Sequence, residues 1–217
     1  MFINIHSHHH ALNNNQWVIQ NLYKEFEKVN EVGNYSIGLH PYYINEATWE
    51  KEFSTLQKFA ANNLVMAIGE CGLDKNCNTD FSLQQKVFSE QIILANSLQK
   101  PLVIHCVNAY QEIVTILKAN KNKVPVVFHG FNKKETIALS LVKEGYYLSF
   151  GKAILKENIQ NLLNKIPADK IFFETDDDII TIEEIYSTAE KTLSVNTESL
   201  QMTIKKNAIK LFGDGLF

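Results

Sequence analysis

Short apolar runs alternate with longer amphipathic segments along most of this 217-residue chain. Runs rich in β-branched and aromatic residues predict strands, whereas apolar positions three or four residues apart predict helices. We expect strands near residues 2–6, 17–21, 35–39, 64–69, 101–105, 124–129, 146–149 and 170–175. We expect helices over residues 47–62, 80–99, 108–120, 133–144, 156–165, 181–193 and 197–212. Strands that alternate with helices are typical of βα units and a parallel sheet.

The first two connections depart from this alternation. Residues 8–15 are too few and too polar for a full helix, so we expect a loop there. Residues 17–22 have two interpretations, a strand followed by a short helix or the opening of a helix that runs to Val29. We favour the strand, because eight strands close a barrel and seven would leave a gap. The expected fold is therefore a single α/β domain over residues 1–217, a (β/α)8 TIM-like barrel trimmed in its first βα units.

Potential metal ligands stand where the apolar runs end. They are His6, His8, Glu70, His105, His129 and Asp176. A parallel barrel collects the C-terminal ends of its strands at one face, where active sites lie. His6 and His8 are two apart on an extended strand, so their side chains point to the same face. A single strand-end histidine is more often a core residue, and a single carboxylate is more often an ion-pair partner. Six such positions together predict a pair of divalent ions that supports hydrolysis.

Composition narrows the expected environment and partners. All twenty-one basic residues are lysine, and the net charge is −3. The lack of arginine weakens any case for tight nucleic-acid binding, because arginine is the usual bidentate partner of phosphate. Transient contact with DNA stays open, since metal ions can neutralise the reacting phosphate. The odd number of cysteines, three, fits free thiols in a reducing cytoplasm. We expect a cytoplasmic protein with no membrane segment or signal peptide.

Several longer motifs surround the candidate ligands. In chain order they are His6-Ser-His8, Gly38-Leu-His40-Pro41, Ala67-Ile-Gly-Glu70-Cys-Gly-Leu-Asp74, Pro101-Leu-Val-Ile-His105, Phe128-His129-Gly-Phe131, Glu174-Thr-Asp176 and Asn207-Ala-Ile-Lys-Leu-Phe212. This series resembles the TatD-type metal-dependent deoxyribonucleases, within the metallo-dependent hydrolase superfamily of barrels. The GE-x-GLD and ETD blocks together are fairly specific, whereas either one alone is weak.

The resemblance implies a role for each ligand. One ion would take His6, His8 and Asp176, the other would take His105 and His129, and Glu70 would bridge them. A hydroxide between the ions would be the nucleophile, and Asp176 would orient it and take its proton. Ions about 3.5–4 Å apart can stabilise both the attacking and the leaving oxygen. Imidazole ligands suit zinc, nickel or iron, and carboxylate and water ligands suit magnesium or manganese, so the mixed set permits several metals.

The chain also departs from the family's pattern around this set. Cys106-Val107 replaces the usual Ser-Arg, Lys75 replaces an aromatic residue, and Asp177-Asp178 replaces an Ala-Pro segment. His40, Lys75 and Lys152 are candidate substrate-binding residues in place of the missing groups.

Three functions therefore stay open. The first is a two-metal phosphodiesterase of the TatD type that cleaves DNA near single-strand ends. The second is a hydrolase of a small ester, amide or phosphoester on the same metal ligands. The third is a non-catalytic barrel that binds metal or a partner. The oligomeric state cannot be predicted from the sequence.

Overall fold

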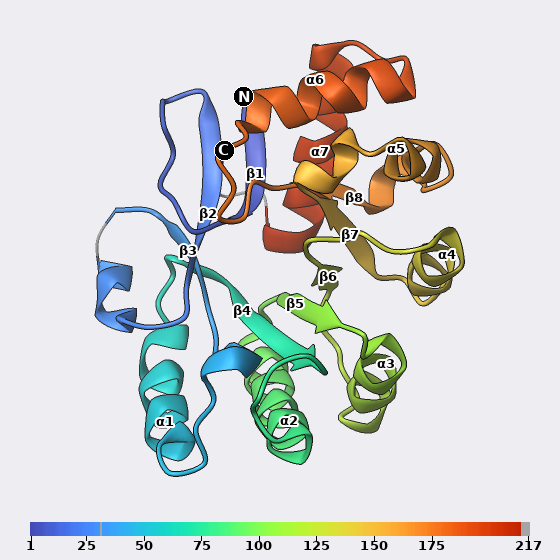
Figure 1. The fold of residues 1–217 in the computed structure, drawn as a ribbon. Coiled ribbons are helices and arrows are strands. Elements are labelled where there is room, and N and C mark those ends of the chain that lie inside the picture. The colour runs from blue at the N-terminus through green and yellow to red at the C-terminus, as the bar shows by residue number, and fades with distance from the viewer. Residues whose placement is uncertain (31, 214–217) are drawn as a thin grey trace. The chain divides into compact units, whose positions relative to one another are not determined.

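A computed structural model describes residues 1–30 and 32–213 of the chain (Figure 1). Its fold is α/β, with eight strands in one sheet in sequential order, as in a TIM-like barrel. The strands are β1 (Phe2–Ser7), β2 (Gln16–Leu22), β3 (Asn34–Ile37), β4 (Val65–Asp74), β5 (Leu102–Val107), β6 (Val126–Phe128), β7 (Tyr147–Phe150) and β8 (Ile171–Phe173). The eight predicted strands are confirmed within a few residues, apart from the C-terminal end of β4, which continues to Asp74.

The seven predicted helices are also confirmed. They are α1 (Trp49–Ala60), α2 (Phe81–Leu98), α3 (Tyr110–Ala119), α4 (Glu135–Lys143), α5 (Glu157–Leu163), α6 (Ile182–Leu193) and α7 (Thr197–Phe212). The chain passes from β1 to β2 through a loop, and the 3-10 helix η1 (Phe26–Asn30) lies between β2 and β3. The strand interpretation of residues 17–22 and the trimming of the first βα units are therefore confirmed. No helix in the described ranges is long and apolar enough to cross a membrane.

The chain divides into two compact units, which are described separately. The first comprises residues 1–20 and the segment that begins at Val127. In it, β1 continues into a parallel bridge between Ser7 and Asp176, just after β8. Tyr186 of α6 is fully buried, and its hydroxyl accepts from the Ile3 N–H (3.2 Å) and donates to the Ile3 carbonyl (3.1 Å). Asn207 of α7 donates to the carbonyl of Ile171 at 3.0 Å. These buried hydrogen bonds fix β1 and β8, the strands that lead to His6 and Asp176.

The second unit comprises residues 21–126 and is built around β4, all of whose residues are buried. Gly72 of β4 pairs with His105 of β5 and has a φ of +137°. A Cβ atom at this position would lie 2.1 Å from the His105 carbonyl oxygen. Only glycine therefore lets the two backbones approach this closely. The close approach places the ligand-bearing ends of β4 and β5 side by side.

Two buried glutamines of α2 fix the loops at the end of this unit that carries the site. The Gln91 side chain accepts from the Leu39 N–H at 2.8 Å and donates to the Leu39 carbonyl at 3.1 Å. The Gln84 side chain makes the same pair of bonds to the Asp74 backbone, at 2.8 and 3.0 Å. Each glutamine amide uses both its oxygen and its nitrogen. These hydrogen bonds take the place of strand pairing for the backbone groups of Leu39 and Asp74.

Candidate metal centre

The first unit brings His6, His8 and Asp176 together. The Nε2 atoms of His6 and His8 each lie 3.4 Å from Oδ1 of Asp176. Backbone bonds hold the three in place: the Asp176 N–H donates to the His6 carbonyl at 3.1 Å, and the His8 N–H donates to the Asp176 carbonyl at 3.0 Å. Asp176 has a φ of +56°, a left-handed conformation that aspartate tolerates better than most residues. The three donor atoms form a group that could hold a metal ion.

Neighbouring histidines strongly perturb the pKa of the Asp176 carboxyl. Burial alone would raise its pKa, but hydrogen bonds from His6 and His8 and attraction to His129 outweigh burial. The pKa of Asp176 therefore lies far below its usual range. The carboxylate is ionised at neutral pH, the form that a divalent cation requires.

His129 and Glu174 extend this cluster. His129 follows β6, and its ring centroid lies 4.2 Å from that of His6. Glu174 follows β8 and is fully buried, with Oε1 3.4 Å from Nδ1 of His129. The same oxygen accepts from the Gly130 N–H at 2.5 Å. A carboxylate beside one ring nitrogen orients a histidine so that the other nitrogen can face a metal.

The second unit holds a separate cluster of His40, Glu70 and His105, which could also hold an ion. Oε1 of Glu70 lies 2.7 Å from Nδ1 of His105 and 3.1 Å from Nε2 of His40. The other ring nitrogen of His40, Nδ1, accepts from the Tyr42 N–H at 3.1 Å. Nε2 of His40 therefore carries the proton in the neutral ring and donates to Glu70. His40 thus acts on Glu70 directly, whereas the sequence predicted it only as a substrate contact.

Neighbouring polar side chains contact Glu70 and His105 and fix their positions. Nε2 of His105 lies 3.0 Å from Oδ2 of Asp74. The side chain of Asn21 accepts from the Glu70 N–H at 2.8 Å, and it donates to Oε2 of Glu70 at 3.4 Å. The sequence predicted no role for Asn21, Asp74 or Glu174. A polar residue inside or at the end of an apolar strand is the signal that would have indicated each of them.

The two lysines predicted as substrate contacts are engaged elsewhere. The Lys75 amino group forms an ion pair with Glu112 of α3. The Lys152 amino group lies 2.6 Å from Oδ1 of Asp178. Both pairs are partly exposed, so a competing phosphate could replace the carboxylate at modest cost. A role for either lysine in substrate binding stays a prediction.

The donor chemistry in both units fits divalent ions. Each cluster combines imidazole nitrogens with a carboxylate that is held by neighbouring hydrogen bonds, the mixed set that zinc and similar metals accept. The predicted sharing of one ion by His105 and His129, with Glu70 as a bridge, would join residues of both units and stays a prediction.

Comparison with protein families identifies the family to which the chain belongs. The model of the family described as "TatD related DNase" matches residues 9–213. The chain belongs to the TatD-related DNase family. With the histidine, glutamate and aspartate clusters described above, this membership places the chain among the metal-dependent hydrolases of the TatD type.

Individual TatD-family relatives agree in sequence and in fold. A protein named "uncharacterized metal-dependent hydrolase" from Buchnera aphidicola subsp. Baizongia pistaciae is 34% identical over 82% of this chain and 73% of its own length. The "3'-5' ssDNA/RNA exonuclease TatD" of Cronobacter sakazakii is 35% identical over 64% of this chain, but the match spans only 55% of that enzyme. The crystal structure of YJJV, a TatD homologue from Escherichia coli K12, superposes with a TM-score of 0.82 at 19% identity and covers 98% of both chains. That likeness shows that this chain has the fold of TatD homologues.

Proposed function

We propose that this chain is a two-metal phosphodiesterase that removes nucleotides from the ends of single-stranded DNA. The observation that carries the proposal is the pair of histidine–carboxylate clusters, His6–His8–Asp176 and His40–Glu70–His105, each at the C-terminal end of strands. Such an end of a parallel barrel is where catalytic groups collect. The named activity of the Cronobacter sakazakii relative supports the single-stranded substrate.

Each residue of the site would have its own role in the reaction. Divalent ions held at this centre would lower the pKa of water and neutralise the phosphate. His6, His8 and Asp176 would hold one ion, His105 and His129 the other, and Glu70 would lie between the two. The two histidines keep the Asp176 carboxylate ionised. In this form it would also orient the attacking water and could accept its proton. His40 would keep Glu70 in place by its hydrogen bond.

A second candidate is a hydrolase of a small ester, amide or phosphoester on the same residues. The observation that favours it is the absence of arginine in a chain of net charge −3. A long polyanion gains affinity from many cationic contacts, whereas a small substrate needs few. A non-catalytic barrel is the least supported alternative, because a barrel without turnover would not need both a bridging carboxylate, Glu70, and a proton acceptor, Asp176.

The test is an elemental analysis of the purified protein together with hydrolysis assays before and after chelation. Single-stranded DNA, duplex DNA and a panel of small esters and phosphoesters are the substrates. The proposal expects metal-dependent release of nucleotides from the single strand, restored when the metal is returned. Turnover of small esters without release of nucleotides would favour the second candidate. A metal-loaded protein with no turnover on any substrate would contradict both.

A further inference from the structure

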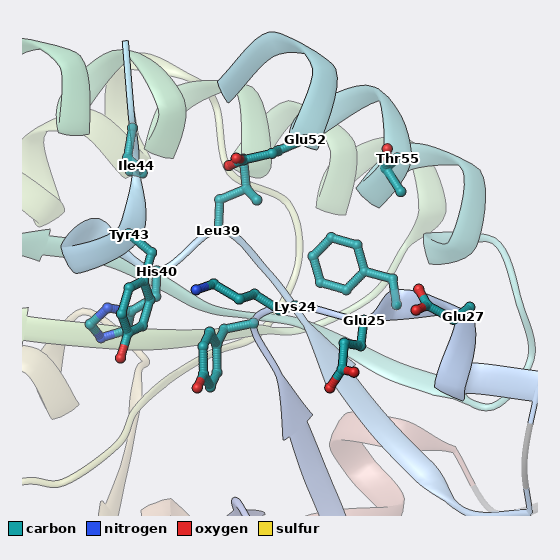
Figure 2. Close-up of a pocket in the computed structure, with 11 residues that line it drawn as sticks. Lys24, Glu25, Glu27, Leu39, His40, Tyr43, Ile44, Glu52 and Thr55 are labelled. Carbon is teal, nitrogen blue, oxygen red and sulfur yellow. The ribbon is translucent and has the colours of Figure 1, made fainter. Parts of the chain in front are cut away.

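A pocket of about 260 Å³ opens in the second unit next to His40 (Figure 2). Its inner wall is apolar and includes the buried side chains of Phe26, Leu39 and Ile44. Pockets that enclose a whole drug-sized ligand measure about 300–1,000 Å³. This pocket therefore suits one flat ring system. His40 lines the pocket with its ring and lies 3.1 Å from Glu70 of the candidate metal centre.

Two tyrosines form an aromatic platform at the pocket. The rings of Tyr23 and Tyr43 stack with their centroids 4.7 Å apart and an interplanar angle of 17°. Tyr43 is 49% exposed, so part of the platform is open to a ligand. Proteins that bind single strands use exposed aromatic rings of this kind as stacking surfaces for bases.

Lys24 supplies a positive charge beside the platform. Its amino group lies 4.9 Å from the centroid of the Tyr43 ring, and Figure 2 shows the side chain extended toward Tyr43 and His40. Within the described residues Lys24 forms no ion pair, in contrast to Lys75 and Lys152. In a chain that has lysine as its only strong cation, Lys24 is therefore available to an anion near the candidate metal centre.

Carboxylates on the other side of the pocket limit what can enter. Glu25 and Glu27 line the side opposite His40 and Tyr43, and Glu52 lies above Leu39 (Figure 2). Glu25 is paired with Lys28 at 2.7 Å. These acids would repel a phosphate deep in the pocket, yet they accept hydrogen bonds from the amino groups of a base. The chemistry therefore favours a base inside the pocket and its phosphate at the Lys24 side.

We propose that this pocket binds the nucleobase of the nucleotide next to the scissile phosphate. The base stacks on Tyr43, the Lys24 amino group contacts the phosphate, and His40 connects the pocket to Glu70. The inference rests on the proposed nuclease function and assigns a base-stacking subsite to it. Base stacking would also supply affinity for a single strand in a chain that has no arginine.

The experiment compares two short single strands that differ only in whether the terminal residue carries a base or is abasic. Affinity is measured by fluorescence anisotropy with chelator present, so that no cleavage occurs, and cleavage is measured in parallel with metal. The wild-type protein is expected to bind the base-containing strand roughly tenfold or more tightly, because stacking on one aromatic ring has about that effect. Tyr43→Ala should remove this preference, and Tyr43→Phe should keep it.

Matched controls separate the subsite from general effects on folding. Tyr42 is adjacent, similarly exposed at 53% and outside the pocket lining, so Tyr42→Ala should keep the preference. Lys24→Gln should weaken binding of both strands alike and reduce the slope of log K against log salt by about 0.7. Lys58 lies over Phe59 on α1, so Lys58→Gln is the control for a lysine above a ring.

The outcomes distinguish the subsite from the function on which it rests. Equal binding of both strands by the wild-type protein, or equal losses in Tyr42→Ala and Tyr43→Ala, would overturn the subsite even if DNA is cleaved. Base-dependent binding that only Tyr43→Ala removes would support the subsite even if no strand is cleaved, and the missing cleavage would then count against the nuclease function.

Discussion

Nε2 of His105 lies 3.0 Å from Oδ2 of Asp74, at the point where β4 and β5 end side by side. The opposite nitrogen, Nδ1, faces Glu70 at 2.7 Å. Asp74 is itself fixed, because it accepts from the Asn76 N–H at 2.7 Å and is 2% exposed. This arrangement makes Asp74 a positioning residue that turns one nitrogen of His105 toward the candidate metal centre.

Asp74→Ala is therefore expected to lower metal affinity by about 10–100-fold, the usual effect of losing such a partner. Asp74→Asn keeps an acceptor oxygen and should retain most of the affinity. Isothermal titration of the chelated protein with zinc or manganese measures both. Asp169→Asn is the control, since Asp169 is exposed and lies 4.0 Å from the amino group of Lys210. Wild-type affinity in Asp74→Ala would contradict the positioning role.

Glu70→Gln and Asp176→Asn are expected to abolish hydrolysis by different routes. Glu70→Gln loses the proposed bridge, so its metal content should fall with its activity. Asp176→Asn could keep metal through its amide oxygen and the two histidines, yet it should lose about 10²–10⁴-fold in rate, the range of general-base catalysis. Asp177→Asn, which changes the exposed neighbouring acid, should match the wild type. Wild-type turnover of Asp176→Asn on a confirmed substrate would show that another group takes the proton.

The low pKa of Asp176 predicts a pH-dependent stability in the metal-free protein. A carboxyl with a folded-state pKa below its unfolded value, about 3.9, stabilises the fold fully above that value. The contribution is lost as the pH falls below about 4 toward the folded-state pKa. The free energy of unfolding of chelated wild-type protein should therefore fall more steeply below pH 4 than that of Asp176→Asn. Parallel curves for the two proteins, measured by urea unfolding, would contradict the histidine–carboxylate contacts.

Binding of single-stranded DNA is expected to be weak and to depend little on salt. The chain has a net charge of −3 and no arginine, and Lys24 lines the same pocket as His40. One or two phosphate contacts imply a slope of log K against log salt of about −0.7 to −1.4 on single strands. Catalytically impaired Asp176→Asn protein with metal present allows the measurement without cleavage. A slope that corresponds to six or more contacts would reveal a lysine surface outside the pocket.

Much of the fold could be predicted because the periodicity of apolar residues changes cleanly between strands and helices. Even the uncertain stretch 17–22 became a strand, as expected from the need to complete the eight-stranded sheet. The grouping of His6 and His8 with Asp176 follows from the parallel order of the strands, since their C-terminal ends share one edge. These features depend on local pattern and on topology, both of which the linear sequence contains.

Other features of the site depend on contacts that no local pattern contains. His40 reaches Glu70 because Gln91 of α2 fixes the backbone of Leu39, a contact between residues 52 positions apart. The ion pair of Lys75 with Glu112 likewise joins residues from different βα units. The platform of Tyr23 and Tyr43 brings the end of β2 beside the Pro41–Tyr43 turn. Each of these pairings joins groups from separate elements that only the folded chain brings together.

In the proposed function, two ions act together in the hydrolysis of single-stranded DNA. The most direct measurement is a stepwise return of metal to chelated protein, with bound metal determined by elemental analysis and nucleotide release measured at each step. Little release is expected while the first ion binds, followed by a steep rise as occupancy approaches two ions per chain. Full activity at one ion per chain, or activity that survives complete chelation, would contradict the proposed function.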